Sequence, residues 1–322
     1  MRAAFVIPEA SGGRLEIREV EAPKVGPAQV LVRVKACGLN RGEVLYRRAA
    51  TKGAPFIGGV EFAGEVAAVG DGVNTVKVGQ RVMGHSIATQ ADYVVCEARA
   101  LMPVPADLSW AEAAAFPNVF ITAHDALVTA GGFKAGENVL INAAPSGIGT
   151  AAVQIAKVLG AKTIIGTSRN RAKLDQVMPL GLTHAVGPGD ALGPAVKAAT
   201  ADKGVNVVID TVGGPALSET LKVMGLNGRL VNIGRMGGRM GEVDMDRLSF
   251  LGLKIIGVSF RARSRGQTLG CIEACAQDLL PHLASGAIKI PIAKTFTLAD
   301  IAAAHDYAER DEHVGKIVLT LD

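Results

Sequence analysis

The chain has 322 residues, a length that predicts two domains at about 150 residues each. Hydrophobic residues make up 49% and charged residues 20%, which is typical of folded rather than disordered chains. The net charge of +4 and the aromatic content of 4% argue against nucleic acid or a membrane surface as the main partner. We therefore expect a small-molecule partner.

The N-terminal residues and the cysteines indicate a cellular compartment. Residues 1–8 lack the apolar stretch of a signal peptide, and the four cysteines form no Cys-x-x-Cys pair. Cys271 and Cys275 stand one helical turn apart with no histidine nearby, a spacing that suits neither a disulfide nor a metal. We therefore expect reduced thiols and a cytoplasmic location. The histidines show no metal-ligand spacing; they occupy positions 85, 124, 184, 282, 305 and 313.

The first part of the chain predicts short strands separated by turn residues, as in a small β-barrel or sandwich. Prolines 103 and 105 end this region, and Ser109 with Glu112 forms the pattern of a capping box that opens an alanine-rich helix. The expected strands are 2–7, 15–20, 29–36, 64–69 and 81–83.

From 118 to 258 strands alternate with helices, which predicts right-handed crossovers and a doubly wound parallel sheet. After 258 we expect a helix from 267, a helix over 298–308 and a closing strand over 316–321 that returns to the first domain. The predicted domains are therefore 1–117 together with 259–322, and 118–258. The strands expected in the second domain are 139–143, 162–167, 205–210, 229–233 and 253–258, and the helices are 147–159, 171–178 and 215–224.

Small residues join the strand over 139–143 directly to the next helix. Ala144, Ser146 and Gly149, with an added Gly147, stand where a G-x-G-x-x-G motif has glycines. Small residues let the backbone approach a pyrophosphate, and the helix N-terminus presents N–H groups to its charge. Any tight strand–helix turn can show this match, but its place in the first strand–helix unit favours a dinucleotide site. The expected contacts are Ser146, Gly147, Ile148 and Gly149.

The end of the next strand distinguishes two dinucleotides. An NAD site has an acidic residue about 20 residues after the glycine motif, and no acidic residue occurs there. Ser168 can donate a hydrogen bond to a 2′-phosphate, and Arg169, Arg171 or Lys173 can neutralise it. The alternative is a solvated basic helix start, but cations are unfavourable at a helix N-terminus unless an anion is present. We therefore expect NADPH rather than NADH.

Seven motifs, in order along nearly the whole chain, resemble one protein family. They are Ala36-Cys37-Gly38-Leu39-Asn40, Gly58-Gly59-Val60-Glu61-Phe62-Ala63-Gly64, Val69-Gly70-x-Gly72-Val73, Gly79-Gln80-Arg81-Val82, Thr122-Ala123-His124-Asp125-Ala126-Leu127, the loop 142–149 and Gly315-Lys316-Ile317-Val318-Leu319. This combination is similar to the medium-chain dehydrogenase/reductase superfamily, in particular its zinc-independent quinone oxidoreductases (zeta-crystallin-like). The resemblance implies an α/β protein with a GroES-like β-barrel catalytic domain and a Rossmann NADP-binding domain. It also implies a homodimer or homotetramer, often joined at Rossmann sheet edges, here over 253–260.

The resemblance also bears on metal binding. The alcohol dehydrogenase branch holds a catalytic zinc with Cys, His and Cys at positions that match Asn40, Val60 and Asn118, none of which is a thiolate or an imidazole. The loop after Val82 lacks the cysteine cluster of a structural zinc. We therefore expect no metal. Without a Lewis acid, alcohol oxidation loses its driving chemistry, whereas hydride delivery to a conjugated acceptor remains possible.

The resemblance implies that Asn40 lies beside the nicotinamide and that Tyr46 faces the substrate. Asn40 would hydrogen-bond the substrate carbonyl oxygen, and Tyr46 would donate a proton directly or through water, unless it only closes the pocket. Arg47 and Arg48 either attract an anionic substrate such as a coenzyme A ester or are solvated. Glu61 is expected to be structural or paired with an arginine.

Further cofactor contacts are expected at strand ends and at family positions. Thr122 is expected at a helix start, and Lys316 either contacts the cofactor or pairs with a surface acid. The expected contacts are Thr122, Val212, Gly213, Ile233, Gly234, Ser259, Phe260, Arg261 and Lys316.

The preferred function is an NADPH-dependent reductase that transfers hydride to a quinone or an α,β-unsaturated carbonyl compound. Residues 142–147 and the Arg169 region also resemble enoyl reductases, so an enoyl thioester (enoyl-CoA) reductase is an alternative. A non-catalytic NADPH-binding protein is a further alternative, and a zinc alcohol dehydrogenase would require bound metal.

Overall fold

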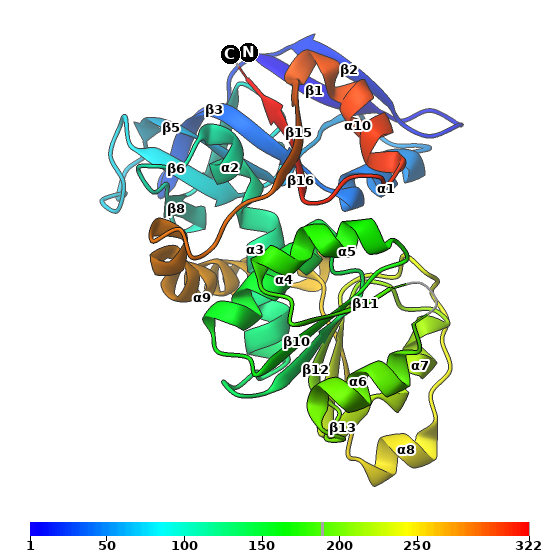
Figure 1. Ribbon diagram of the computed structural model, residues 1–322. Coiled ribbons are helices and arrows are strands. Elements are labelled where there is room, and N and C mark those ends of the chain that lie inside the picture. Colours follow the sequence, from blue (N-terminus) through cyan, green and yellow to red (C-terminus); the bar gives the residue numbers. More distant parts are fainter. Residues whose placement is uncertain (188–189, 322) are drawn as a thin grey trace. The chain divides into compact units, whose positions relative to one another are not determined.

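The computed structural model describes residues 1–187 and 190–321. The contacts within the chain divide it into two compact units, and each is described by itself (Figure 1). Unit 1 comprises Met1–Asn118, Ile272–Gln277 and Ile290–Asp322, and unit 2 comprises Val119–Cys271 and Asp278–Lys289. The predicted division differs here, because it assigned everything after 258 to the first domain, whereas most of the segment between 259 and 289 belongs to unit 2.

Unit 1 is built on two sheets whose strands are mainly antiparallel. One has the order β2-β1-β4 and the other the order β15-β16-β3-β5-β6-β8, with β7 also paired to β3. In β3 buried and less buried residues alternate, as expected for a strand with one face on the core. The strands are β1 (Arg2–Ile7), β2 (Arg14–Glu19), β3 (Gln29–Leu39), β4 (Phe56–Ile57), β5 (Glu61–Val69), β6 (Arg81–His85), β7 (Tyr93–Glu97), β8 (Leu101–Pro103), β15 (Ile292–Thr297) and β16 (Lys316–Thr320).

The C-terminal strand β16 pairs antiparallel with β3, with Ile317 opposite Leu39 and Val318 opposite Gly38. The tail therefore returns to the N-terminal sheet, as predicted. β3 continues three residues beyond its predicted end at 36. This extension brings the end of β3 beside the start of β16.

Helices of unit 1 connect and cover these sheets. The capping box before α2 (Trp110–Ala115) is confirmed, because Ser109 Oγ accepts from the backbone N–H of Glu112 and Glu112 accepts from that of Ser109. Helix α1 (Arg41–Ala49) was not predicted. Its N-cap residue is Asn40, whose side chain makes no capping bond; its Oδ1, the atom that would accept from a backbone N–H, accepts from Lys316 Nζ instead. The remaining helices are η1 (Ala98–Ala100), η5 (Leu298–Asp300) and α10 (Ile301–Glu309).

Unit 2 is a six-stranded parallel sheet with the order β11-β10-β9-β12-β13-β14. This confirms the predicted Rossmann fold. The strand order reverses between β9 and β12, the position where ligands bind in such sheets. The strands are β9 (Asn138–Ile141), β10 (Thr163–Thr167), β11 (His184–Val186), β12 (Val205–Asp210), β13 (Met224–Asn232) and β14 (Lys254–Gly257).

The helices of unit 2 follow the alternating pattern expected from the sequence, although α6 and β11 were not predicted. Helix α9 carries Pro281 within it and has residues in both units. The helices are α3 (Pro117–His124), whose first two residues belong to unit 1, η2 (Asp125–Ala130), α4 (Gly147–Val158), α5 (Arg171–Val177), η3 (Met178–Leu180), α6 (Leu192–Thr200), α7 (Ala216–Lys222), α8 (Met245–Phe250), η4 (Phe260–Ala262) and α9 (Arg265–Ala284).

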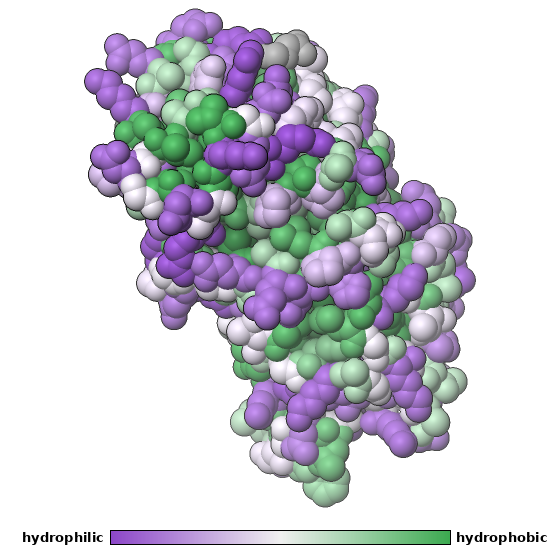
Figure 2. All heavy atoms as spheres, turned by 90° about the vertical axis from the view of Figure 1, so that its left-hand side faces the viewer, coloured by the Kyte–Doolittle hydropathy of each residue, from purple (hydrophilic) through white to green (hydrophobic). Residues whose placement is uncertain are grey.

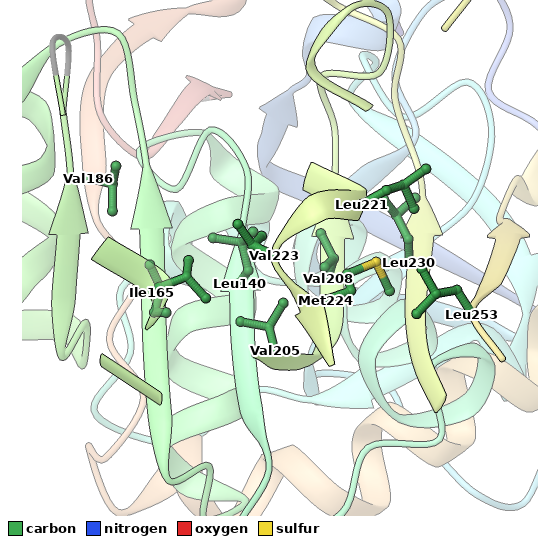
Figure 3. Close-up of a cluster of buried hydrophobic side chains, with 11 residues drawn as sticks. Leu140, Ile165, Val186, Val205, Val208, Leu221, Val223, Met224, Leu230 and Leu253 are labelled. Carbon is green, nitrogen blue, oxygen red and sulfur yellow. The ribbon is translucent and has the colours of Figure 1, made fainter. Parts of the chain in front are cut away.

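One row of side chains crosses the parallel sheet and forms a core of unit 2. Ile165, Leu140, Val208 and Leu230 occupy matching register positions on β10, β9, β12 and β13, and all four are fully buried. Figure 3 shows them among the other apolar residues of this cluster. Burying such side chains is worth about 1.5–3 kcal/mol each. This packing holds the central strands in register and thereby fixes the positions from which the loops at their ends begin.

The surface carries hydrophobic residues in several patches between hydrophilic ones, as Figure 2 shows for one face. The most exposed large apolar side chains are Phe250, Met240 and Ile87, at 86%, 85% and 80%. Within the described ranges no helix is both long and apolar enough to cross a bilayer. The four cysteines form no disulfide with one another in the described ranges.

Candidate functional site

The loops predicted to bind the dinucleotide follow the carboxyl ends of five strands of unit 2. The segment 142–146 follows β9, Ser168 follows β10, Val212 follows β12, Ile233 follows β13 and Ser259 comes two residues after β14. Because all six strands are parallel, these loops lie at one edge of the sheet. The structure therefore brings together the strand-end residues that the sequence placed far apart.

The turn between β9 and α4 accepts only small residues. Ala143 has a φ of 55°, in the left-handed region, and Ser146 caps α4 by accepting from the backbone N–H of Gly149 at 3.0 Å. A Cβ atom at Gly149 would lie 2.5 Å from the carbonyl oxygen of Ala144 and 2.6 Å from that of Ala143. Glycine is therefore required at this position. The first N–H groups of a helix lack intrahelical partners, so this turn fits a diphosphate.

A buried carboxylate, Asp210, connects the ends of the three central strands. Its Oδ1 accepts from Asn142 Nδ2 at 3.2 Å and its Oδ2 from Asn232 Nδ2 at 3.0 Å. It also accepts from the backbone N–H groups of Val212 and Gly213, at 3.0 and 3.1 Å. Asp210 thus sets the conformation of the loop after β12. The sequence analysis did not assign it a role, although a polar residue that ends an apolar strand is a usable signal.

Threonines complete this polar network around Asn142. Its Oδ1 accepts from Thr167 Oγ1 at 3.1 Å, and its Nδ2 also donates to Thr220 Oγ1 at 3.1 Å. Thr211 donates to the Asn142 carbonyl oxygen at 3.2 Å. Buried polar groups that are fully paired make a region rigid. The network therefore positions the strand ends at the point where the strand order reverses.

The loop after β10 is organised by its own hydrogen bonds. Ser168 Oγ accepts from the backbone N–H of Asn170 at 3.0 Å, and Asn170 caps α5 by accepting from the backbone N–H of Lys173 at 3.3 Å. These hydrogen bonds fix the conformation of the loop and the start of α5, where the predicted phosphate contacts lie. Since Ser168 uses a lone pair as acceptor, its hydroxyl hydrogen remains available to a phosphate.

Arg171 has acidic neighbours that the sequence analysis did not recognise. Its Nε donates to Asp175 at 3.1 Å, and its NH1 lies 3.9 Å from Asp190, which follows β11. Counting along the chain from Gly149 to the end of β10 misses Asp190, because it lies beyond the next strand, β11. The Arg171 side chain is 59% exposed, so a phosphate can compete with these pairs.

In unit 1 the side chain of Asn40 is surrounded by charged groups. Its Oδ1 accepts from Lys316 Nζ at 2.6 Å, and its Nδ2 donates to Glu43 at 3.0 Å and to Glu61 at 2.8 Å. Both amide hydrogens are therefore bound within the protein. The predicted role of Asn40, donation to a substrate carbonyl, needs one of them to be freed.

Lys316 and Glu61 form a buried ion pair of 2.7 Å. Glu61 also accepts from the backbone N–H of Asn118 at 2.8 Å, and Lys316 donates to the Leu39 carbonyl oxygen at 3.3 Å. Neither expectation for Lys316 included this: it pairs with a buried acid rather than a surface one. Glu61 was expected to be structural or paired with an arginine, and its ion-pair partner is a lysine.

The positions that match the zinc ligands of the alcohol dehydrogenase branch do not fit a metal. Asn40 directs its amide hydrogens at two carboxylates, and the Asn118 backbone binds Glu61. Over residues 1–187 and 190–321 no group of three or more His, Cys, Asp and Glu side chains can hold a metal ion.

Glu43 extends this cluster toward the loop after β6. Its Oε2 accepts from Gln90 Nε2 at 2.8 Å, and Gln90 is 1% exposed. Burial raises the pKa of Glu43 to about 7, although the hydrogen bond from Asn40 and the charge of Lys316 act in the opposite direction. The sequence analysis missed both residues; the local signal for Glu43 was an acid one turn after Asn40.

Tyr46 and the two arginines after it lie on α1. The Tyr46 side chain is 52% exposed and meets the ring of Phe56 edge-on, with centroids 6.1 Å apart. Arg47 and Arg48 bind Glu309 of α10 at 3.0 and 2.6 Å. The two arginines therefore tie α1 to α10, and because they share the single carboxylate of Glu309, one positive charge remains in excess among these three side chains.

Two other predicted contacts have different surroundings from those expected. Thr122 is buried and lies near the end of α3, not at a helix start. Phe260 packs its ring against the guanidinium of Arg263 at 4.8 Å, and Arg263 binds the buried Asp125 at 2.7 Å. Within unit 2 the ion pair of Arg263 with Asp125 thus links the segment after β14 to η2.

Comparison with known proteins supports both parts of this fold. Residues 26–123 match the Alcohol dehydrogenase GroES-like domain family, and residues 147–274 match the Zinc-binding dehydrogenase family. The chain is 30% identical to quinone oxidoreductase-like protein 2 of Bos taurus, over 95% of this chain and 89% of that protein. It is 32% identical to a phenolphthiocerol/phthiocerol polyketide synthase of Mycobacterium tuberculosis over 99% of its length, but it spans about 15% of that protein.

Solved structures of similar proteins share the fold over the whole chain. A mycobacterial protein complexed with NADPH has a TM-score of 0.87 at 28% identity, with both chains fully covered. The CurK enoyl reductase has a TM-score of 0.85 at 26% identity, with 100% of this chain and 99% of that chain covered. These likenesses extend across both units.

Proposed function

The chain belongs to the medium-chain dehydrogenase/reductase superfamily, and from this premise we propose that it is an NADPH-dependent reductase of quinones or α,β-unsaturated carbonyl compounds. The likeness to quinone oxidoreductase-like protein 2 and to a mycobacterial protein complexed with NADPH supports this reaction class. The zinc positions of the family carry residues that do not fit a metal, which favours acceptors that need no Lewis acid.

The observation that carries the proposal is the phosphate turn of unit 2. Gly149 permits a tight turn, because a Cβ there would lie 2.5–2.6 Å from two backbone carbonyl oxygens, and Ser146 caps the start of α4. The diphosphate of a dinucleotide fits this helix N-terminus. When bound, NADPH supplies the hydride, and the protein supplies binding and orientation.

Residues after β10 favour the phosphorylated dinucleotide. Ser168 can donate to the 2′-phosphate, while Arg169 and Lys173 add positive charge. Arg171 would join them by exchanging its exposed carboxylate partners for the doubly charged phosphate. The missing acid at the end of β10 removes the group that would repel this phosphate.

The acceptor requires a proton and a partner for its oxygen. Hydride addition to a conjugated carbonyl or a quinone places negative charge on oxygen, and donors aimed at that oxygen lower the barrier. Tyr46, with an exposed side chain on α1, is the proposed proton donor, unless it only forms a pocket wall. Asn40 is the proposed partner of the oxygen.

A second candidate is reduction of an enoyl thioester. The likeness to a polyketide synthase and to the CurK enoyl reductase favours it. Arg47 and Arg48 share the single carboxylate of Glu309, which leaves one positive charge in excess for the phosphates of a coenzyme A ester. A small enone and an enoyl-CoA therefore distinguish these substrate classes.

The test is NADPH and NADH oxidation by the purified protein with a small quinone, a small enone and an enoyl-CoA. The proposal expects turnover with the quinone or the enone and a higher kcat/KM with NADPH. Preference for the enoyl-CoA would favour the second candidate. NADPH binding without turnover of any acceptor would instead indicate a non-catalytic binding protein.

We also propose that the protein is a homodimer or homotetramer joined through β14. This strand is the last in the parallel sheet, and its Ile255 is 42% exposed. An uncovered edge strand offers unpaired backbone groups to a second copy. Light scattering of the wild type and of Ile255→Pro tests this, since proline removes a backbone donor. A monomeric wild type would contradict it.

A further inference from the structure

The hydrogen bonds of Asn40 limit what its amide can do. Nδ2 lies 3.0 Å from Glu43 Oε1 and 2.8 Å from Glu61 Oε1, and Oδ1 accepts from Lys316. A primary amide has two hydrogens to donate, and both are used here. A hydrogen bond from Asn40 to a substrate oxygen therefore requires that its hydrogen bond to one of the two carboxylates weakens.

The two carboxylates hold Asn40 with different strength. Glu61 is fully buried, pairs with Lys316 at 2.7 Å and also accepts from the Asn118 backbone. Glu43 accepts from the neutral amide of Gln90, and no cation lies within ion-pair distance of it in the described part of the chain. Two carboxylates on one nitrogen disfavour each other's ionised form. The unpaired one, Glu43, takes up a proton first.

We propose that Glu43 is a positioning residue whose protonation releases one amide hydrogen of Asn40 for a hydrogen bond to the oxygen of the acceptor. Bonds to an ionised carboxylate are roughly twice as strong as those between neutral groups, so a protonated Glu43 competes less well for this hydrogen. The inference rests on the proposed reductase function, and it adds a control on the acceptor side of that reaction.

The groups around Glu43 set where it titrates. Glu61 on β5 raises its pKa, Lys316 on β16 and the Asn40 hydrogen bond lower it, and burial dominates and raises it to about 7. Cys37 on β3 also faces it, and burial raises the pKa of that thiol well above its ordinary value, so it stays neutral. Glu43 is therefore the group of this cluster that changes charge near neutral pH.

The direct test follows the side-chain amide of Asn40 by NMR in the full-length, ligand-free protein across neutral pH. The signals are assigned by their loss in Asn40→Ser. We expect both amide hydrogens to be protected above neutral pH and one of them to lose protection below it, where protection is the exchange rate relative to that of a free side-chain amide at the same pH. In Glu43→Gln this titration disappears. Asn40 signals that ignore pH in the wild type, or that still titrate in Glu43→Gln, would overturn the proposal.

The kinetic test compares pH profiles of acceptor reduction. For the wild type, kcat/KM is expected to fall about tenfold per pH unit once Glu43 ionises. Glu43→Gln removes that decline and keeps activity at high pH, because a neutral side chain leaves the Asn40 hydrogen available. The matched control Glu219→Gln, an exposed glutamate on α7 in unit 2, keeps the wild-type profile. A folded Glu43→Gln protein that is inactive at every pH contradicts the proposal.

The two tests separate this inference from the proposed function. A protein that reduces no acceptor contradicts the proposed function, and the NMR titration still decides the role of Glu43. A protein that reduces acceptors but shows no titration of the Asn40 amide contradicts only the role of Glu43.

Discussion

Lys316 Nζ and Glu61 Oε1 lie 2.7 Å apart inside unit 1, and the two side chains are 5% and 0% exposed. The pair joins the C-terminal strand β16 to β5, with β3 between them in the sheet. Each charge is further bound by Asn40, and Glu61 by the Asn118 backbone. The ion pair is therefore the fixed centre around which the polar residues of unit 1 are arranged.

Removing the ammonium group of Lys316 should lower the free energy of unfolding. Lys316→Met leaves the Glu61 carboxylate buried without its cation, and we expect a loss of about 3–5 kcal/mol in the free energy of unfolding. Denaturant titration measures it. The control Lys222→Met breaks the exposed Lys222–Glu219 pair and should cost less than about 1 kcal/mol. Equal losses in the free energy of unfolding for both substitutions would show that burial of the Lys316–Glu61 pair does not increase its contribution to stability.

His305 makes stability depend on pH. It is 2% exposed, and neither ring nitrogen has a hydrogen-bond partner among residues 1–187 and 190–321. Burial, with the charge of Arg47, lowers its pKa from 6.5 to about 4. Between about pH 4 and pH 6.5, His305 therefore binds a proton in the unfolded chain but not in the folded chain. Stability is therefore intact above about pH 6.5 and falls by about 3 kcal/mol toward pH 4.

The measurement is the free energy of unfolding of the wild type and of His305→Phe as a function of pH. The His305→Phe protein should lose less stability between neutral pH and pH 4 than the wild type. His184→Gln, which changes an exposed histidine, serves as control and should keep the wild-type slope. Identical slopes for all three proteins would show that His305 is not the titrating group.

A carboxylate at the end of β10 should alter cofactor choice. Ser168→Asp places a negative charge where the 2′-phosphate is expected, so kcat/KM with NADPH should fall at least about tenfold while NADH is affected less. Steady-state kinetics with both dinucleotides give the ratio. Ser285→Asp, at the exposed end of α9, adds the same charge elsewhere and should leave the ratio unchanged. An unchanged ratio in Ser168→Asp would contradict the assigned phosphate position.

The phosphate turn should not tolerate a side chain at Gly149. Gly149→Ala places Cβ against two carbonyl oxygens at 2.5–2.6 Å, so the turn must shift and NADPH affinity should drop at least about tenfold. Gly193→Ala in α6 is the matched control, because a Cβ there meets nothing within 4 Å, and it should bind NADPH normally. Calorimetric titration distinguishes the two. Normal binding by Gly149→Ala would place the diphosphate elsewhere.

Tyr46→Phe tests the proton donor. If the hydroxyl delivers the proton, turnover falls at least about tenfold with little change in KM. Tyr93→Phe, on β7, provides a control for the loss of a phenol hydroxyl. An unchanged kcat with an altered KM would make Tyr46 a wall of the acceptor pocket.

Local patterns in the sequence determined most of the fold. Val205–Asp210 is a strand over the predicted range, and the apolar runs separated by helices predicted the parallel sheet of unit 2. The capping box at Ser109 and Glu112 was predicted because both partners lie within one helical turn. The short strands β4 and β8 were missed, since two or three residues carry too little periodicity.

Only the tertiary structure decided how the polar residues pair. Lys316 meets Asn40 across 276 positions and Glu61 across 255, and Asp190 approaches Arg171 from the segment after the neighbouring strand β11. These contacts follow from strand pairing and its register, which depend on the packing of the entire sheet. The sequence alone therefore predicted a dinucleotide-binding fold and its phosphate turn, whereas the partners of Asn40, and with them its available hydrogens, emerged from long-range folding.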